Sequence, residues 1–334
     1  MDWYGKTIRL SAATLLCAVI LRLGTAGFFN PVVEFFTSET VAEILWFLET
    51  GRRLPPPEVP ETTVPTTQPP ETLAPTQPTE VSLPESSAPA DLWDAGSVQI
   101  NSYCGYEPQV EAWLEQPLDW QLRTEVPTVL ILHSHATESY ENTEGYEESS
   151  AYRTRDLHRN VVSVGDYLVQ LLENAGIHVL HDRQLHDHPS YSDAYGNSRA
   201  SVQQYLKQYP SIRLVLDLHR DAVADNSGKQ LSYTVPGTDV AKLMLVVGSD
   251  AGGLSHSKWP ENMSLAVKLH AQLEQLLPGI CRPISFRTQR FNQDLSTGAL
   301  IVEVGAAGNT RQQALKGAEY LAKAIIGLAS GTAS

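Results

Sequence analysis

Three short polar segments carry side chains that could bind a metal ion and use it in catalysis. They are His133 and His135 after residues 128–132 (TVLIL), His219 after residues 214–218 (LVLDL), and Glu303 within residues 299–304 (ALIVEV). Imidazole and carboxylate groups are ligands that zinc prefers, and a catalytic zinc site keeps three protein ligands and one position for water. One histidine after a strand is usually structural. Two such strand ends and a glutamate on a third strand indicate a shared zinc site.

Hydrolysis at a metal site also needs a group that moves protons. Glu303 is the candidate, because an apolar strand surrounds it and burial raises the pKa of a carboxyl group. The alternative is a buried glutamate that only satisfies backbone donors near Asn309. Arg220 and Asp221 directly follow His219, and they either orient that imidazole, grip substrate or form a structural ion pair. A serine hydrolase is not favoured, because the sequence has no G-x-S-x-G elbow.

A sheet flanked by helices must position these residues. The expected strands, which are short apolar runs, are 128–132, 177–182, 214–218, 242–248 and 299–304. The expected helices, which carry helical apolar spacing or helix end signals, are 156–174, 193–208, 261–277 and 310–328. Alternating strands and helices predict an α/β fold with a mostly parallel sheet and helices on both faces. In such a sheet, sites gather at the carboxyl ends of the strands.

The predicted folded domain, residues 92–334, follows a segment of very different composition. Residues 53–91 are rich in Pro, Thr, Ser and Glu, and 11 of the 21 prolines fall between Pro55 and Pro89. Such a segment cannot bury enough apolar surface to offset the entropy of its chain. It is therefore predicted to be a disordered linker that gives the folded domain reach.

Residues 1–52 are predicted to form a membrane anchor and a juxtamembrane segment. Lys6 and Arg9 precede the uncharged run 10–21, and residues 28–49 are apolar with scattered glutamates. Basic residues before the run favour a cytoplasmic N-terminus. The prediction is a single-pass protein of the cell membrane with its folded domain on the extracytoplasmic side. A cleaved signal peptide and a buried core helix are the alternatives.

Charge and cysteine content exclude several classes of protein. The net charge of −14 leaves no excess of basic residues to neutralise phosphates, so nucleic-acid binding is not expected. Three cysteines without a CxxC pair provide neither a zinc ribbon nor a redox motif. Cys104 and Cys281 are expected to be buried thiols, with a disulfide between them as the alternative.

Five blocks of sequence follow one another through the predicted domain. They are HSHATESY (133–140), YRTRDLHRNVVSVGDYL (152–168), HDHPSYSDAYGNS (186–198), LDLHRDA (216–222) and VEVGAAGNT (302–310). Together they resemble the stage II sporulation protein P family, as do the anchor and the Pro-rich linker. That family is similar to the zinc-dependent N-acetylmuramoyl-L-alanine amidases, which cleave the amide between the stem peptide and muramic acid.

The resemblance implies a zinc-dependent peptidoglycan amidase, with endopeptidase activity as well. It implies a role in engulfment of the forespore, beside the lytic transglycosylase stage II sporulation protein D. A catalytically inactive, peptidoglycan-binding tether on the same fold is the alternative function. The presence of His135, His219 and Glu303 together favours the enzyme, because a binding module needs none of them.

The amidase pattern also implies individual roles. A zinc-binding histidine follows the first strand, which implies His135, with His133 as the alternative, and a second zinc-binding histidine is implied at His219. Glu303 matches the catalytic glutamate, and Asn309 matches the asparagine that follows it.

The middle zinc ligand has two candidates in this sequence. Asp156 lies four residues before Asn160, as the amidase glutamate lies before an asparagine, and its carboxylate is shorter than that of glutamate. Glu138 lies three residues after His135. Asp156 is the favoured prediction and Glu138 the alternative.

Overall fold

The computed structural model of the chain describes residues 91–94, 96, 98–118, 120–141 and 152–331. The chain divides into residues 1–76 and 77–334, and only the second unit contains described residues. The predicted anchor and all but the last residue of the predicted linker therefore lie outside the described residues. Within the described part of the chain, no helix is both long and apolar enough to cross a membrane.

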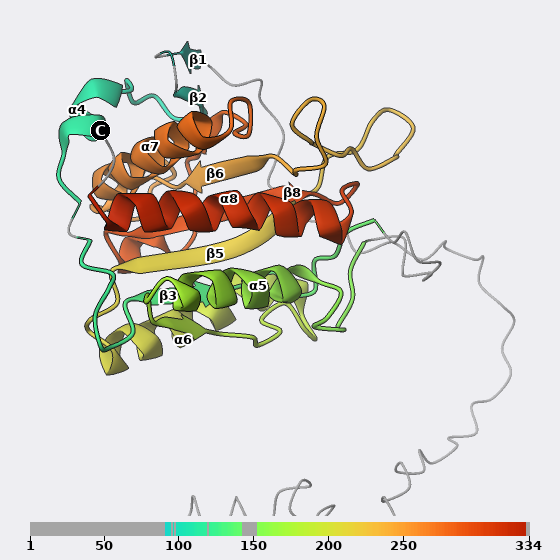
Figure 1. The fold of residues 1–334 in the computed structure, drawn as a ribbon, viewed down its shortest axis with the longest axis horizontal. Helices are drawn as coiled ribbons and strands as arrows, with labels where there is room; N and C mark the ends of the chain where they lie inside the picture. Colours follow the sequence, from blue (N-terminus) through green and yellow to red (C-terminus); the bar gives the residue numbers. More distant parts are fainter. Residues whose placement is uncertain (1–90, 95, 97, 119, 142–151, 332–334) are drawn as a thin grey trace, which may run out of the picture. The chain divides into compact units, whose positions relative to one another are not determined.

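A single eight-stranded sheet forms the centre of the described unit (Figure 1), in the order β1-β2-β7-β6-β8-β5-β3-β4. Its strands are β1 (Asp91–Asp94), β2 (Gln99–Ser102), β3 (Val129–Leu132), β4 (Val179–His181), β5 (Leu214–Asp221), β6 (Leu243–Val247), β7 (Ile284–Phe286) and β8 (Ala299–Ala306). The predicted α/β class and all five predicted strands are confirmed.

Two blocks of strands run in opposite directions within this sheet. Strands β4, β3, β5 and β8 are parallel to one another. Strand β6 is antiparallel to β8, and β7 and β2 continue in the direction of β6. The sheet is mostly parallel, as predicted, and the carboxyl ends of β3, β5 and β8 share one edge of it.

Helices cover both faces of the sheet. They are α4 (Val110–Glu115), α5 (Val161–Asn174), α6 (Ala194–Gln208), α7 (Trp259–Leu276) and α8 (Arg311–Ala329). Helices α5 and α8 run side by side across one face, and α7 packs beside α8 (Figure 1). Along β3, Val129 and Ile131 join this core, whereas Leu130 and Leu132 pack with Val202 of α6 on the other face.

The pleat places two of the predicted site residues on the α6 face. Val215 belongs to the α6 core, and side chains alternate along a strand, so Asp217 and His219 share its face. In the register of β5 with β8, Asp217 lies opposite Ile301 and His219 lies opposite Glu303. The imidazole and the glutamate are therefore neighbours across two adjacent strands.

Helix α5 begins five residues later than predicted. Asn160 has an extended backbone, and its side chain accepts a hydrogen bond from the backbone N–H of Val162, which caps the helix at that point. Asp156 therefore lies in the turn before the helix. Strands β1, β2 and β7 and helix α4 were not predicted, because each is short and lacks a long apolar run.

Cys104 and Cys281 are free thiols with different neighbours. The sulfur of Cys104 lies 3.7 Å from the carbonyl oxygen of Phe286, and that of Cys281 lies 3.8 Å from the carbonyl oxygen of His270. Burial raises the pKa of both thiols, so both are protonated at neutral pH. Each therefore packs as a small apolar side chain.

His133 is a core residue beneath α5. It is fully buried, its Nδ1 lies 3.0 Å from the carbonyl oxygen of Leu218, and its Nε2 lies 2.9 Å from Nε2 of His181. Gly165 of α5 makes room for this pair, since a Cβ there would lie 2.7 Å from both Nε2 atoms. The structure thus uses His133 for packing between the sheet and α5.

Replacing Gly165 with Ala is expected to lower the free energy of unfolding by about 1–3 kcal/mol, because the added methyl overpacks the histidine pair. Gly196→Ala in α6 is the matched control, since its Cβ would meet nothing within 4 Å. That change should stabilise the protein by up to about 1 kcal/mol through helix propensity. Urea unfolding measures both. Equal stability of Gly165→Ala and the wild type would show that the pair is not tightly packed.

Candidate metal and catalytic site

The segment after β3 turns back across the carboxyl ends of β5 and β8. The backbone N–H of Glu138 donates to the carbonyl of His135 (3.1 Å), and bridges tie Glu138 to Arg153 and Ser139 to Asn160. The imidazole rings of His135 and His219 lie 5.3 Å apart at 80°. This turn therefore brings one imidazole and one carboxylate to the strand that carries His219.

Glu138 is a buried carboxylate surrounded by positive groups. Its Oε2 lies 3.4 Å from Nδ1 of His219 and accepts the backbone N–H of Arg220 at 3.1 Å. Its Oε1 lies 3.6 Å from Nη1 of Arg220 and 3.9 Å from Nη2 of Arg153. Burial alone would raise the pKa of Glu138, but Arg220 and His219 hold it well below its ordinary value. Glu138 is therefore ionised, as a metal ligand must be.

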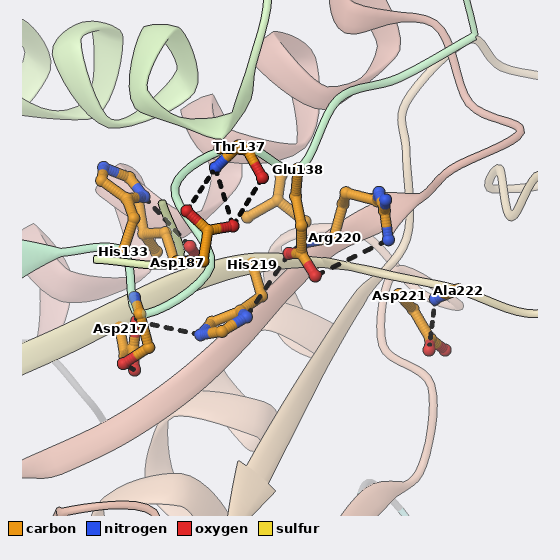
Figure 2. A network of polar contacts seen from close by, with 12 residues as sticks. His133, Thr137, Glu138, Asp187, Asp217, His219, Arg220, Asp221 and Ala222 are labelled. Atoms are coloured by element: carbon orange, nitrogen blue, oxygen red, sulfur yellow. Dashed lines mark hydrogen bonds and ion pairs between the residues drawn. The ribbon is translucent and has the colours of Figure 1, made fainter. Parts of the chain in front are cut away.

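His219 lies between two carboxylates, Asp217 and Glu138 (Figure 2). Its Nε2 is 2.9 Å from Oδ1 of Asp217, in an ion pair rather than a well-aligned hydrogen bond. Burial lowers the pKa of this imidazole, but the two carboxylates raise it well above its usual value. The positive charge between the two carboxylates is thus carried by the protonated imidazole of His219.

His135 is held by aromatic rings. It stacks on Tyr191 at 4.3 Å and 14°, and Tyr195 meets it edge-on at 5.4 Å. Arg153 covers Tyr191, with its guanidinium carbon 4.3 Å from the ring centre. Burial lowers the pKa of His135 to about 3, so the imidazole is neutral, which is the form that binds metals. Its Nδ1 is buried without a hydrogen-bond partner.

Glu303 is buried on β8 opposite His219, and its Oε2 has no hydrogen-bond partner. Burial raises its pKa to about 8, and the charges of Asp221 and Glu138 add to this effect against the opposing charge of His219. A carboxyl group with a pKa near neutral can both accept and release a proton at physiological pH. Perturbed groups of this kind concentrate at functional sites.

One pair of donor atoms has the spacing that two ligands of a zinc ion have. Two ligands bonded to zinc at about 2.0–2.2 Å lie roughly 3.3–3.5 Å apart, and Glu138 Oε2 and His219 Nδ1 are 3.4 Å apart. His135 Nδ1 is a further buried donor without a partner. Among the described residues no three His, Cys, Asp or Glu side chains already form a complete metal cluster. Binding a metal here would replace the proton between Glu138 and His219.

The chain matches one known protein family over most of its length. The model of the family "Stage II sporulation protein P (SpoIIP)" matches residues 63–326. The chain belongs to the stage II sporulation protein P family. Within the family, the stage II sporulation protein P of Bacillus subtilis (strain 168) is 28% identical over 206 residues. That match covers 58% of this chain and 49% of the Bacillus protein, so it spans about half of the relative's length.

Several solved structures match part of this chain. The CwlD amidase of Clostridioides difficile, solved in complex with the GerS lipoprotein, is 10% identical with a TM-score of 0.39, and the match covers 62% of this chain and 98% of that one. The N-acetylmuramoyl-L-alanine amidase AmiC2 of Nostoc punctiforme is 14% identical with a TM-score of 0.37, over 59% of this chain and 94% of that one.

Membership of the stage II sporulation protein P family leaves the middle ligand to be decided by geometry. The side chain of Asp156 is 41% exposed, and it pairs with Arg159 at 3.3 Å in the turn before α5. The side chain of Glu138 is 7% exposed and contacts His219. The structure does not bring Asp156 to the imidazoles, because α5 begins after the cap at Asn160 and Asp156 lies in the exposed turn before it. It brings Glu138 there instead.

Arg220 acts through Glu138 and through the backbone. Its guanidinium is almost fully buried, donates from Nε to the carbonyl of Ser139 (2.9 Å) and donates from Nη2 to the carbonyl of Tyr152 (2.9 Å). With its ion pair to Glu138, it fixes the turn that carries this carboxylate. Arg220 was predicted to orient His219, grip substrate or form a structural ion pair, and the structure shows an ion pair that positions Glu138.

Asp221 and Asn309 lie away from the imidazoles and make structural contacts. Asp221 pairs with Arg282, after an irregularity in the β5–β8 register that separates it from His219. The side-chain oxygen of Asn309 accepts the backbone N–H groups of Ala306 (2.9 Å) and Tyr233 (3.0 Å). Asn309 thereby joins the end of β8 to the β5–β6 connection.

Three residues at the site were not found from the sequence, namely Asp217, Tyr191 and Tyr195. Asp217 had a usable signal, because residues i and i+2 of a strand share a face, and Asp217 precedes His219 by two. The tyrosines had none, since they come from the start of α6 and the short helical turn before it. Their contact with His135 depends on how α6 packs on the sheet.

Proposed function

We propose that this chain is a zinc-dependent peptidoglycan hydrolase of sporulation, an N-acetylmuramoyl-L-alanine amidase that also has endopeptidase activity. Family membership supports a role in sporulation. The observation that carries the chemistry is Glu303, which is buried opposite His219 with a raised pKa and an unpartnered oxygen. We further propose a membrane anchor in residues 1–52, an extracytoplasmic folded domain and a partnership with a stage II sporulation protein D-like transglycosylase.

His135, Glu138 and His219 would hold the zinc ion. Once His219 gives up one proton to the solvent, two neutral imidazoles and one carboxylate form a ligand set typical of catalytic zinc sites with an open position. Bound zinc would supply Lewis acidity toward the amide carbonyl and would make water acidic at neutral pH. Arg220 keeps Glu138 ionised, and both Arg220 and Arg153 pair with its carboxylate.

Glu303 would move the proton. An amide nitrogen leaves poorly as an anion, so hydrolysis requires a group that takes a proton from the attacking water and delivers it to the departing amine. A carboxyl group with a pKa of about 8 serves both steps near neutral pH.

The test uses the full chain purified in mild detergent, its zinc content measured by mass spectrometry, and purified sacculi as substrate. Amidase activity releases stem peptides with a free N-terminal alanine and leaves intact glycan strands. Endopeptidase activity cuts cross-links and leaves stems attached to the glycan. Binding to sacculi without either product would instead establish the tether.

Glu138→Gln is expected to lose most of the bound zinc and to reduce amide hydrolysis by at least about 10²-fold, because a neutral amide is a poor zinc ligand. Asp156→Asn is the matched control and should keep wild-type zinc content and rate, since its carboxylate is exposed. Competition with a chromogenic chelator measures the zinc affinity of the two variants, and digestion of sacculi measures their rates. The opposite pattern would assign the middle ligand to Asp156.

A further inference from the structure

Asp217 is a buried carboxylate that the proposed ligand set does not use. It lies on β5 two residues before His219 and on the same face, toward α6. Leu132, Val202 and Val215 line the small cavity that its side chain also borders. A carboxylate in such apolar surroundings is costly unless its oxygens are paired. The groups that contact the carboxylate of Asp217 therefore indicate its role.

Asp217 is fixed by donors on one side. Its Oδ1 accepts the backbone N–H of Ser134 at 2.7 Å, and its Oδ2 accepts the hydroxyl of Ser134 at 2.6 Å. The same hydroxyl lies 2.7 Å from that of Ser198 on α6. Ser134 precedes His135, so this network ties the ends of β3 and β5 together. The carboxylate cannot turn without breaking both bonds.

The two carboxylates beside His219 stand at different distances. Asp217 Oδ1 lies 2.9 Å from Nε2 in an ion pair, so a small rotation of the ring would align the N–H of Nε2 with this oxygen. Glu138 Oε2 lies 3.4 Å from Nδ1, which is the separation of two ligands on one zinc ion. The distances thus distinguish the two sides of the ring (Figure 2).

We propose that Asp217 is a positioning residue that keeps the proton of His219 on Nε2 and presents Nδ1 to the metal. The inference rests on the proposed function, because it concerns the same metal site. A carboxylate that accepts the second N–H of a metal-bound histidine fixes its tautomer and orientation, and it makes the imidazole a stronger ligand. Ser134 and Ser198 hold Asp217 for this purpose.

Asp217→Asn tests the role with little disturbance of the fold. The amide oxygen can still accept the backbone N–H of Ser134, and the amide nitrogen can donate to the Ser134 hydroxyl, which then donates to Ser198. Only the negative charge of the carboxylate beside Nε2 of His219 is lost. Asp225→Asn is the control, because Asp225 is fully exposed and bonds only within its own turn.

The experiment measures zinc dissociation constants by chelator competition, on the full chain in detergent. Loss of a supporting carboxylate typically weakens metal affinity 10–100-fold, so that shift is expected for Asp217→Asn and no shift for Asp225→Asn. On ¹⁵N-histidine-labelled protein loaded with ¹¹³Cd, NMR should show coupling to Nδ1 of His219 and a proton on Nε2. Replacement of His219 assigns the signal.

Three results would overturn the proposal. These are unchanged zinc affinity in Asp217→Asn, complete loss of zinc, which would make Asp217 a ligand, or coupling of the metal to Nε2. The proposed function can fail separately. If the wild type binds zinc through Nδ1, and Asp217→Asn binds it more weakly, but sacculi remain intact, the positioning role stands and the amidase does not.

Discussion

Glu303→Gln is expected to lose about 10²–10⁴-fold or more of the rate of amide hydrolysis while keeping its zinc and its affinity for muramyl peptides. This is the usual contribution of general acid–base catalysis, and glutamine can neither accept nor release the proton. Released stem peptides, quantified by mass spectrometry from purified sacculi, give the rate, and metal analysis gives the zinc content. Wild-type turnover by this variant would make Glu303 a structural residue.

The same variant should change how stability depends on pH in the metal-free protein. The pKa of Glu303 rises from 4.5 to about 8 on folding, mainly through burial. The folded state therefore holds a proton that the unfolded state releases. Glu303 contributes fully to the free energy of unfolding below about pH 4.5. As the pH rises through 8, this contribution falls by up to about 1.4 kcal/mol per pH unit.

Urea unfolding in a chelator at pH 5, 6, 7 and 8 measures this dependence. Glu303→Gln removes the titrating group, so its stability relative to the wild type should improve steadily across the series. Parallel pH profiles for the two proteins would show that Glu303 ionises normally in the folded state.

His219→Ala is expected to reduce zinc from about one ion per chain to background and to abolish hydrolysis, and His135→Ala should do the same. A catalytic zinc site with three ligands cannot spare one, because the remaining pair leaves the metal exposed to exchange. Metal analysis after dialysis, and digestion of sacculi, measure the two effects.

His133→Ala is the control for these variants. It should keep zinc, because its imidazole packs against His181 beneath α5, and it should lose stability through the cavity that it creates. If His133→Ala lost zinc and His135→Ala kept it, the first ligand would lie two residues earlier in the chain.

The sheet around the site could be predicted because its strands are continuous apolar runs. Because β3, β5 and β8 are buried on both faces, each appears in the sequence as a continuous apolar run. The polar residues at the ends of these runs then indicate the edge of the sheet where the site lies. The reversal of direction at β6 could not be predicted, since a buried strand has the same pattern in either direction. Strand β7 is too short to give a signal.

The proposed metal ligands were harder to predict from the sequence than the strands of the sheet. His133 and His135 have the same chemistry and neighbouring positions, and only packing against α5 separates them. The resemblance favours Asp156 over Glu138 because of its spacing from Asn160, whereas in the structure Asn160 caps α5 and Asp156 lies in the turn before it. The contact of Glu138 with His219 depends on the turn after β3, which the sequence pattern does not show.

Arg220 has a consequence for engineering the protein. Its buried guanidinium bonds to the carbonyls of Ser139 and Tyr152, and the N–H of Glu141 donates to the carbonyl of Asn309. One side chain of β5 therefore holds the backbone at Ser139, the backbone at Tyr152 and the carboxylate of Glu138. A substitution at Arg220 would disturb all three contacts together, so this position should be left unchanged when the neighbouring residues are varied.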